Sequence, residues 1–198
     1  NTTTDYDPEE IKRGISITTA LAPIEWDGCK INLIDAPGFF DFEGEITQAY
    51  YLADEALILV NAFSGVGVGA DKAYKYCKKA GKPMAFAVNQ IDKEHASFDK
   101  VLEELRSSYG QAVAPLQYPI MEGNAFKGFV DVVENKAYLF DGEKVKETEI
   151  PSDAEANVME YREALIEEAA GSDEELMDKY FGGEDLSKDD ILKGIKLG

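Results

Sequence analysis

An acidic residue and a Pro-Gly turn stand together where a short apolar stretch of the sequence ends. Residues 30–34 (KINLI) read as a buried strand, the turn Asp35-Ala36-Pro37-Gly38 follows it, and a helical pattern begins soon afterwards. A carboxylate can hold magnesium through water, and the N–H of a neighbouring glycine can meet an anionic oxygen. Ligands of α/β proteins bind at this end of the strands. The spacing predicts a magnesium–phosphate site, with an ordinary strand-to-helix turn as the alternative.

A second polar group, Asn89-Gln90-Ile91-Asp92, follows another apolar run at residues 84–88. The Asp92 carboxylate can accept two N–H groups from a guanine edge, while Asn89 can bond the purine or brace neighbouring loops. Losing such a two-point pairing is costly in a closed pocket, so this group would favour guanine over adenine. A plain polar turn is the alternative.

A hydroxyl side chain precedes both groups. Ser16 lies in the segment 13–17 (RGISI), about twenty residues before Asp35. A serine hydroxyl can ligate magnesium directly as a neutral oxygen ligand. The alternative is a simple loop that leads into a strand. The three groups gain weight together, because each lies next to an expected strand and they follow one another in a fixed order.

The elements that must position these groups follow from apolar runs and turn signals. Strands are expected at residues 19–26, 30–34, 56–61 and 84–88, and helices at residues 45–53, 70–80 and 98–109. Asp27-Gly28 is a hairpin signal that makes the first two strands antiparallel neighbours. The continuous apolar run 56–61 predicts a strand covered on both faces. The order predicts a doubly wound α/β sheet with one antiparallel edge strand.

The glycine-rich segment 64–69 is predicted to be a flexible connection. It lacks the Gly-Lys-Ser/Thr ending of a P-loop, and it lies after Asp35 rather than before it. A helix ended by Gly81 is expected to follow it. The segment therefore offers no substitute for a phosphate cradle.

The second half of the chain has a different texture. Strands are expected at residues 129–133, 136–140 and 144–150, and helices at residues 153–170, 173–181 and 188–195. Ser172 and Ser187 are candidate N-caps, the second with Asp190 three residues on. The pattern predicts an α+β subdomain, and we place the domain boundary between residues 1–117 and 118–198.

Composition excludes some classes of partner. The chain of 198 residues has 20 basic and 39 acidic side chains, a net charge of −19. Such a charge repels phosphate over a long range and argues against general nucleic-acid or membrane-surface binding. No apolar run approaches the length of a membrane helix, and no signal peptide precedes the first strand. Cys29 and Cys77 are interpreted as reduced, buried cysteines of a cytoplasmic protein.

The motifs together resemble those of the translational GTPases, and most of all the elongation factor G branch. The opening segment NTTTDYDPEEIKRGISIT is similar to switch I, DAPGFFDFEGEI to switch II, and NQID to the guanine motif NKxD. FKGFVDVVENKAY and the run through EELMDKYFGGEDLSKDDI resemble the insertion that separates this branch from elongation factor Tu. The resemblance covers nearly the whole chain and implies a P-loop-NTPase-like doubly wound sheet with an α+β insertion.

The resemblance also implies a site and its ligands, GTP or GDP and Mg²⁺. Ser16 falls on the threonine that ligates magnesium, and Asp35 on the aspartate that holds it through water. Gly38 falls on the γ-phosphate amide, within a nucleotide-binding segment that also includes Ala36, Pro37 and Phe39. The guanine-binding segment comprises Asn89, Gln90, Ile91 and Asp92. Implied partners are the ribosome, with its stalk protein at the acidic insertion, while contact with ribosomal RNA falls to parts outside these residues and no membrane is involved.

Three features depart from the family pattern. Phe39 stands where the family has the histidine that orients the attacking water, and a phenyl ring cannot position water. Gln90 replaces a lysine whose stem covers the purine and whose charge braces the P-loop. No P-loop precedes Ser16, and the guanine-contacting Ser-Ala loop is absent too. We therefore expect these residues alone to be inactive, and residues 1–18 to be mobile.

Three functions stay open at this point. The first is a GTP hydrolase of the elongation factor G type that binds GTP and drives a step on the ribosome, in translocation, recycling or ribosome protection. The second, favoured by Phe39 and Gln90, is a paralog that binds nucleotide or the ribosome with weak or no hydrolysis. The third is an interaction domain that no longer binds nucleotide. An upstream Gly-x-x-x-x-Gly-Lys-Ser/Thr would separate the third from the others, and ribosome-stimulated hydrolysis the first from the second.

Several aromatic residues and one histidine have simpler interpretations. Phe39, Phe40 and Phe42 are expected to pack beneath the switch helix, with docking on a partner as the alternative. Trp26, Tyr50 and Tyr51 are expected in the core or at its rim. His95 is expected on the surface without a catalytic role.

Overall fold

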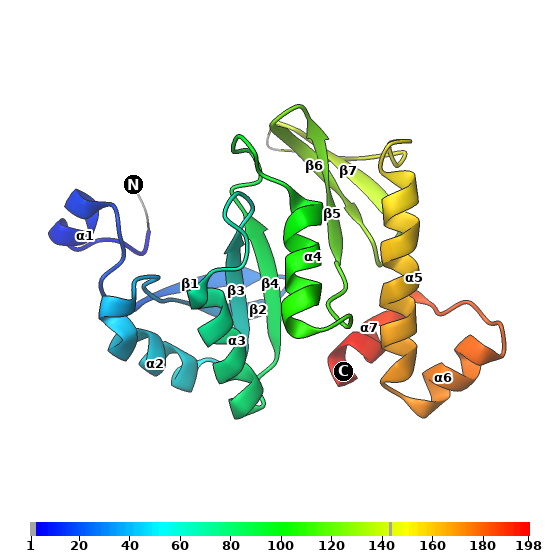
Figure 1. The fold of residues 1–198 in the computed structure, drawn as a ribbon, viewed down its shortest axis with the longest axis horizontal. Helices are drawn as coiled ribbons and strands as arrows, with labels where there is room; N and C mark the ends of the chain where they lie inside the picture. The colour runs from blue at the N-terminus through cyan, green and yellow to red at the C-terminus, as the bar shows by residue number, and fades with distance from the viewer. Residues whose placement is uncertain (1–2, 143) are drawn as a thin grey trace. The chain divides into compact units, whose positions relative to one another are not determined.

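The computed structural model describes residues 3–142 and 144–198 (Figure 1). The chain divides into two compact units, one of residues 1–60 and 66–89 and one of residues 61–65 and 90–198. We call them the switch unit and the insertion unit. Leu102 of the helix 98–109 shares a buried cluster with Val132 and Tyr161. This shared core places that helix in the insertion unit, although the domain boundary was expected at 117/118.

The described residues of the switch unit form three helices, a short 3-10 helix and four strands. In chain order they are α1 (Pro8–Arg13), β1 (Ala20–Trp26), β2 (Cys29–Asp35), η1 (Phe40–Phe42), α2 (Glu43–Leu52), β3 (Ala56–Asn61), α3 (Val68–Ala80) and β4 (Met84–Asn89). β1 pairs with β2 and β3 with β4, as two separate ladders of hydrogen bonds. The α/β class is confirmed.

The hairpin signal at Asp27-Gly28 is confirmed. β1 and β2 are antiparallel from the pair Trp26–Cys29 to the pair Ala20–Asp35. Asp27 and Gly28 have φ angles of 47° and 73°, which is the left-handed geometry of a two-residue turn that matches the strand twist. The turn thereby fixes which residue of β1 lies opposite Asp35.

β3 and β4 run in the same direction. The N–H of Ala56 donates to the carbonyl of Pro83 at 3.1 Å beside the starts of the two strands. Asn61 Nδ2 donates to Gln90 Oε1 at 2.7 Å beside their ends. A parallel pair needs a crossover, and α3 supplies it with Gly81 as its left-handed C-cap.

The expectation that the run 56–61 is covered on both faces is wrong. Ile58 and Val60 are 5% and 2% exposed, whereas Leu57 and Leu59 are both 62% exposed. Successive side chains of a strand point to opposite faces, so one face of β3 is packed and the other is open. An unbroken apolar run therefore did not distinguish a strand covered on both faces from one covered on a single face.

The insertion unit combines a four-stranded sheet with four helices. In chain order they are α4 (Phe98–Tyr109), β5 (Gln117–Glu122), β6 (Ala125–Asp131), β7 (Lys136–Asp141), β8 (Lys144–Thr148), α5 (Glu155–Gly171), α6 (Glu174–Phe181) and α7 (Lys188–Leu197). The sheet order is β5-β6-β7-β8, and all its pairs are antiparallel. β5 was not predicted. It contains Pro119, which an edge strand tolerates because one side of it needs no ladder partner.

A closed apolar core lies between α5 and this sheet. Val130 of β6 and Ala137 of β7 are fully buried and pack with Ala154 and Val158 beside and on α5. Gly128 is required in β6, because a Cβ there would lie 1.9 Å from the carbonyl oxygen of Tyr138. The strand predicted at residues 129–133 is observed as β6 (Ala125–Asp131), so it begins earlier and includes this glycine.

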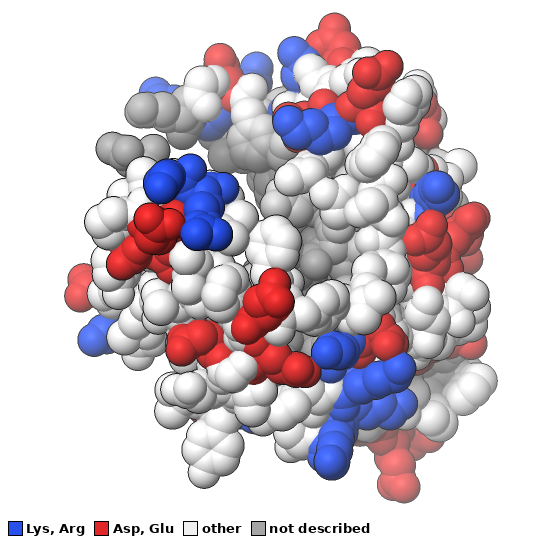
Figure 2. All heavy atoms as spheres, turned by 60° about the vertical axis from the view of Figure 1, so that its left-hand side comes forward, with Lys and Arg blue, Asp and Glu red and all other residues white. Residues whose placement is uncertain are grey.

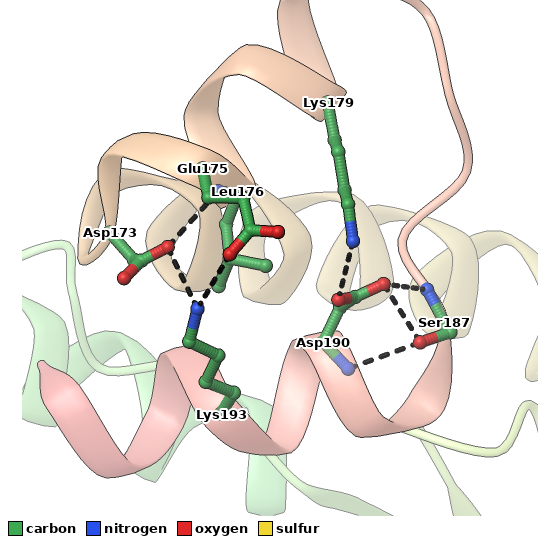
Figure 3. A network of polar contacts seen from close by, with 7 residues as sticks. All are labelled: Asp173, Glu175, Leu176, Lys179, Ser187, Asp190 and Lys193. Atoms are coloured by element: carbon green, nitrogen blue, oxygen red, sulfur yellow. Dashed lines mark hydrogen bonds and ion pairs between the residues drawn. The ribbon is translucent and has the colours of Figure 1, made fainter.

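Helices α6 and α7 are joined by polar contacts (Figure 3). Lys193 Nζ of α7 lies 3.1 Å from Asp173 and 3.3 Å from Glu175. Lys179 Nζ lies 3.0 Å from Asp190. Ser187 caps α7 in a reciprocal box with Asp190, as predicted. The other predicted cap is wrong, because Asp173 caps α6 while Ser172 ends α5.

Further expectations about burial are also wrong. Residues 30–34 do not form a buried strand, because Ile31 and Leu33 are 47% and 45% exposed, and Tyr51 is 79% exposed. Trp26 is 74% exposed, and Cys29 is exposed although Cys77 is buried as expected. Phe39 and Phe40 are 53% and 48% exposed, so they do not form a core beneath the switch helix. Periodicity identified these side chains as apolar, but it did not show whether another element covers them.

Candidate functional site

The segment from Asp35 to Phe39 leaves the ladder and turns outward. Asp35 is half-buried at the end of β2, where it pairs with Ala20 of β1. Pro37 is buried and Gly38 is exposed, with no atom within 4 Å of where its Cβ would be. The backbone of Phe39 is extended, with φ −86° and ψ 137°, and η1 begins directly after it. The Gly38 amide thus lies in an open turn directly after the half-buried acid.

The loop that carries Ser16 is organised by one buried carboxylate. Glu10 of α1 is 1% exposed and is the only buried charged residue among those described. Its Oε1 accepts the N–H groups of Ile17 and Thr18, both at 2.9 Å, and the hydroxyl of Thr18 at 3.1 Å. Its Oε2 accepts the N–H of Asp7 at 3.2 Å in a capping box. Residues 3–18 therefore have defined contacts, which argue against the expected mobility, while residues 1 and 2 lie outside the described part.

These hydrogen bonds keep Glu10 ionised. The N–H of Thr18 and then that of Ile17 favour the carboxylate and lower the pKa of Glu10 to about 2. A carboxylate that accepts several N–H groups binds them more weakly once it takes up a proton. The closed form of the loop therefore depends on the charge of this side chain.

Ser16 and Thr19 make contacts on either side of this closure. The Ser16 hydroxyl donates to Asp5 Oδ1 at 2.7 Å. The N–H of Thr19 donates to Glu45 Oε2 at 2.8 Å, and the Thr19 hydroxyl donates to the carbonyl of Glu45 at 3.2 Å. Glu45 belongs to α2, which follows the Asp35 turn. The loop is thus tied both to α1 and to the helix on the far side of the site.

Helix α2 is held in turn by α3. The two helices lie side by side (Figure 1), and the rings of Tyr50 and Tyr76 stack with their centroids 4.7 Å apart. Lys72 Nζ lies 3.1 Å from Glu43 Oε1 and 4.6 Å from the centre of the Phe40 ring. The start of the helix after Gly38 is therefore fixed from the α3 side as well.

The polar group after β4 is organised around Gln90. Gln90 has a φ of 59°, in the left-handed region that few side chains adopt. Its Oε1 accepts from Asn61 Nδ2, while Asn61 Oδ1 accepts the N–H groups of Phe63 and Ser64 at 2.8 and 3.1 Å. Asn89 and Asp92 are exposed on either side of Gln90 and Ile91. Gln90 thus orients Asn61, and the Oδ1 of Asn61 holds the turn that follows β3.

The donors around Ser16 and Asp35 suit magnesium by their chemistry. Both offer oxygen, and Mg²⁺ is commonly bound by one or two protein oxygens together with phosphate and water. Within residues 3–142 and 144–198 no three acidic, histidine or cysteine side chains gather as a metal site.

Comparison with a protein-family model shows the family of this chain. The model of the elongation factor Tu GTP-binding domain matches residues 1–178. The chain belongs to the translational GTPases. The predicted fold class and the predicted elongation factor G resemblance are both confirmed.

Two relatives of this translational GTPase are named elongation factor G or elongation factor G-like protein. The chain is 36% identical over 194 residues to an elongation factor G-like protein of Thermotoga maritima, with 98% of the chain and 28% of that protein aligned. It is 34% identical over 197 residues to elongation factor G of Mycoplasma pneumoniae, with 98% and 29% aligned. A crystal structure of a protein from Thermus thermophilus matches with a TM-score of 0.90 at 35% identity, over 98% of this chain and 29% of that one. The chain spans less than a third of the length of these relatives.

The surface charge and the helices of this GTPase-family chain are relevant to its binding partners. Acidic and basic side chains are interspersed on the face drawn in Figure 2, where they form no continuous basic surface. Of the helices in the described part, none has the length and apolarity needed to cross a bilayer.

Four of the side chains that hold the site were not predicted from the sequence, namely Glu10, Glu45, Lys72 and Asn61. One of them left a usable signal, since Asp7 and Glu10 have the spacing of a capping box. The contact between Thr19 and Glu45 spans 26 residues of sequence. Nothing in the local pattern indicates such a pair, because it forms only when the loop and α2 meet.

Proposed function

We propose that this chain is part of an elongation factor G-like GTPase that binds GTP and acts on the ribosome in translocation or a related step. The observation that supports it is the meeting of two segments at one hairpin. The loop with Ser16 enters β1 opposite Asp35, and the Gly38 turn leaves from β2. Family membership and the names of the relatives also support this proposal.

Each site residue receives a role in this proposal. The Ser16 hydroxyl ligates Mg²⁺, Asp35 holds the ion through water, and the Gly38 amide meets the γ-phosphate. Asn89 and Asp92 contact the guanine base. When bound, Mg²⁺ neutralises phosphate charge, and the residues of the chain orient and enclose it.

Nucleotide affinity is the first test. The 198 residues contain no Gly-x-x-x-x-Gly-Lys-Ser/Thr, and that loop with its lysine supplies much of the β/γ-phosphate contact. We expect titration calorimetry of the isolated chain with Mg·GTP to detect no micromolar binding. A longer form that includes such a loop is expected to bind GTP, and Asp92→Asn in it is expected to relax the preference for guanine. Micromolar binding by the 198 residues alone would contradict this assignment of the phosphate site.

Hydrolysis is the second test, and it turns on Phe39. The exposed phenyl ring has no group that can orient water, so the longer protein is expected to hydrolyse GTP slowly. Phe39→His is expected to raise ribosome-stimulated turnover by roughly tenfold or more, in the range of general acid–base effects. If turnover does not rise in this variant while GTP still binds, the second function considered above, nucleotide binding without hydrolysis, is the better description.

A stalk-protein contact at the insertion is a further part of the proposal. Helix α6 carries Glu174, Glu175 and Asp178, and Phe181 at its end is 79% exposed. Chemical-shift mapping with an isolated stalk domain tests it. Shifts confined to α6 and α7 would support the contact, and their absence would remove this partner without affecting the nucleotide assignment.

A further inference from the structure

Three consecutive backbone N–H groups directly after Ser16 are each held by a carboxylate. Glu10 takes those of Ile17 and Thr18, and Glu45 takes that of Thr19 at 2.8 Å. Hydrogen bonds to a charged acceptor are about twice as strong as neutral ones. The backbone on this side of Ser16 is therefore fixed at three successive positions, from two different helices.

The two sides of Ser16 are held unequally. Toward the N-terminus, the Ser16 hydroxyl donates to Asp5 at 2.7 Å. Toward the C-terminus, the next residues are held by Glu10 and Glu45, and Ala20 then enters the β1 ladder opposite Asp35. Ser16 can therefore release Asp5 while the backbone after it stays bonded to Glu10 and Glu45, so that a movement of this backbone reaches both carboxylates.

Glu45 is the group that joins the two segments of the site. It lies on α2, after the Gly38 turn, yet it accepts from the residue that precedes β1. Its backbone carbonyl also accepts the Thr19 hydroxyl at 3.2 Å, so the contact has two points. A displacement of the loop must then either move α2 or break both bonds.

We infer that Glu45 is a positioning residue that couples the loop bearing Ser16 to helix α2, with Glu10 closing the loop so that the coupling reaches Ser16. The importance of Ser16 rests on the proposed function, whereas the coupling itself rests on contacts within the switch unit. In a nucleotide-binding form, a change at the metal position would move α2 through Thr19. In the reverse direction, a partner that moves α2 would shift Ser16.

Amide hydrogen exchange of the nucleotide-free chain, followed by NMR, tests the coupling. Glu45→Ala is expected to accelerate exchange of the Thr19 amide by about tenfold, the effect of losing one charge-assisted hydrogen bond. Glu43→Ala is the matched control, because Glu43 lies on the same helix and pairs with Lys72 instead. Glu45→Gln keeps an oxygen acceptor and is expected to restore part of the protection.

Reciprocity distinguishes coupling from a local structural role. Glu10→Gln removes the charge that closes the loop but keeps an oxygen acceptor, so it loosens the loop without touching α2 and is expected to accelerate exchange along α2 near Glu45. The double variant Glu10→Gln/Glu45→Ala is expected to show less than the product of the two single effects on α2. Unchanged α2 exchange in Glu10→Gln, or equal acceleration across β3 and β4 in every variant, would overturn the inference.

Failure of the proposed function gives a different result. The exchange measurements use no nucleotide, so a chain that never binds GTP still shows or lacks the coupling. If Glu45→Ala is too unstable to examine, Thr19→Val removes the hydroxyl bond alone and is expected to give a smaller acceleration at the same amides. No acceleration in that variant and in Glu45→Gln alike would again overturn the inference.

Discussion

The insertion unit and the switch unit of this chain are each stabilised internally in a different way. In the insertion unit, Val132, Leu176 and Ile191 are fully buried in one cluster. In the switch unit, Leu57 and Leu59 are 62% exposed on one face of β3. Both units contain strands and helices of ordinary length, so the difference lies in how completely their apolar faces are covered.

The switch unit depends mainly on polar contacts between its segments, whereas the insertion unit adds such contacts, as between α6 and α7, to a closed apolar core. Glu10, Glu45 and Lys72 each join parts of the chain that belong to different elements. Charge-assisted hydrogen bonds are directional and can be exchanged for others. A closely packed core instead resists small changes in shape. We therefore expect the region with the candidate site to rearrange more readily than the insertion unit.

The largest expected effect compares the same substitution in the two units. Leu176→Ala removes a fully buried side chain and is expected to cost about 2–5 kcal/mol of unfolding free energy. Leu59→Ala on the open face of β3 is expected to change it by about 0.5 kcal/mol or less. Urea unfolding followed by NMR peak intensities reports each unit separately. Equal losses for both variants would break the comparison.

A smaller effect is expected from crowding the contact between α5 and α7. A Cβ on Gly194 would lie 2.5 Å from the Ala169 carbonyl oxygen, so Gly194→Ala is expected to cost about 1–3 kcal/mol. Gly171→Ala is the control, since no atom lies within 4 Å of its Cβ position. A gain of up to about 1 kcal/mol is expected there, from better helix propensity. Similar thermal midpoints for both variants would show that α5 and α7 can move apart to accommodate the added methyl group.

Acid should weaken the closure of residues 17 and 18 onto Glu10. The pKa of Glu10 is lowered to about 2 in the folded chain from an ordinary value of 4.5. The unfolded state therefore binds more protons, and the stabilisation by Glu10 is complete above pH 4.5 and is lost as pH falls toward 2. Exchange of the Ile17 and Thr18 amides is expected to report this loss.

Glu10→Gln is the control for the acid experiment. Its loop amides are expected to be less protected at neutral pH and to change little between pH 4.5 and 2. The pKa of Asp190, in the insertion unit, is also lowered to about 2, chiefly by the Ser187 hydroxyl and then by Lys179. Asp190→Asn should therefore alter acid sensitivity near α7 only. Loss of protection throughout the chain at one pH would contradict separate responses.

The smallest effect is expected from the surface ion pairs of α6 and α7. Lys193 contacts Asp173 and Glu175, and its side chain is 44% exposed (Figure 3). Lys193→Ala is expected to lower the thermal midpoint slightly at low salt and not at all in about 1 M salt, where the screening length is about 3 Å. Lys196→Ala on the same helix is the matched control. A large, salt-independent loss for Lys193→Ala would show that ion pairs rather than burial hold this unit.

The sequence by itself determined the elements whose signals are local. The Asp27-Gly28 turn needs left-handed backbone at both positions, and Asp and Gly are suited to it. The capping box of Ser187 and Asp190 involves residues three apart, and the 98–109 helix has its buried residues at helical spacing. The motif at Asp35 also lies at a strand end, as its apolar run indicated. All of these depend on neighbours in the chain.

Only the tertiary structure decided which apolar and polar groups find partners. The burial of alternate residues in an apolar run cannot be read from the run itself, because exposure depends on which other element covers each face; here Ile58 is covered and Leu57 is open. Asp173 rather than Ser172 caps α6, because α5 extends one residue further than its pattern indicated. The contact of Thr19 with Glu45 joins residues 26 apart and exists only once β1, β2 and the Gly38 turn bring the loop back to α2. Local preference specified the segments, and long-range packing and charge pairing specified how the site is held.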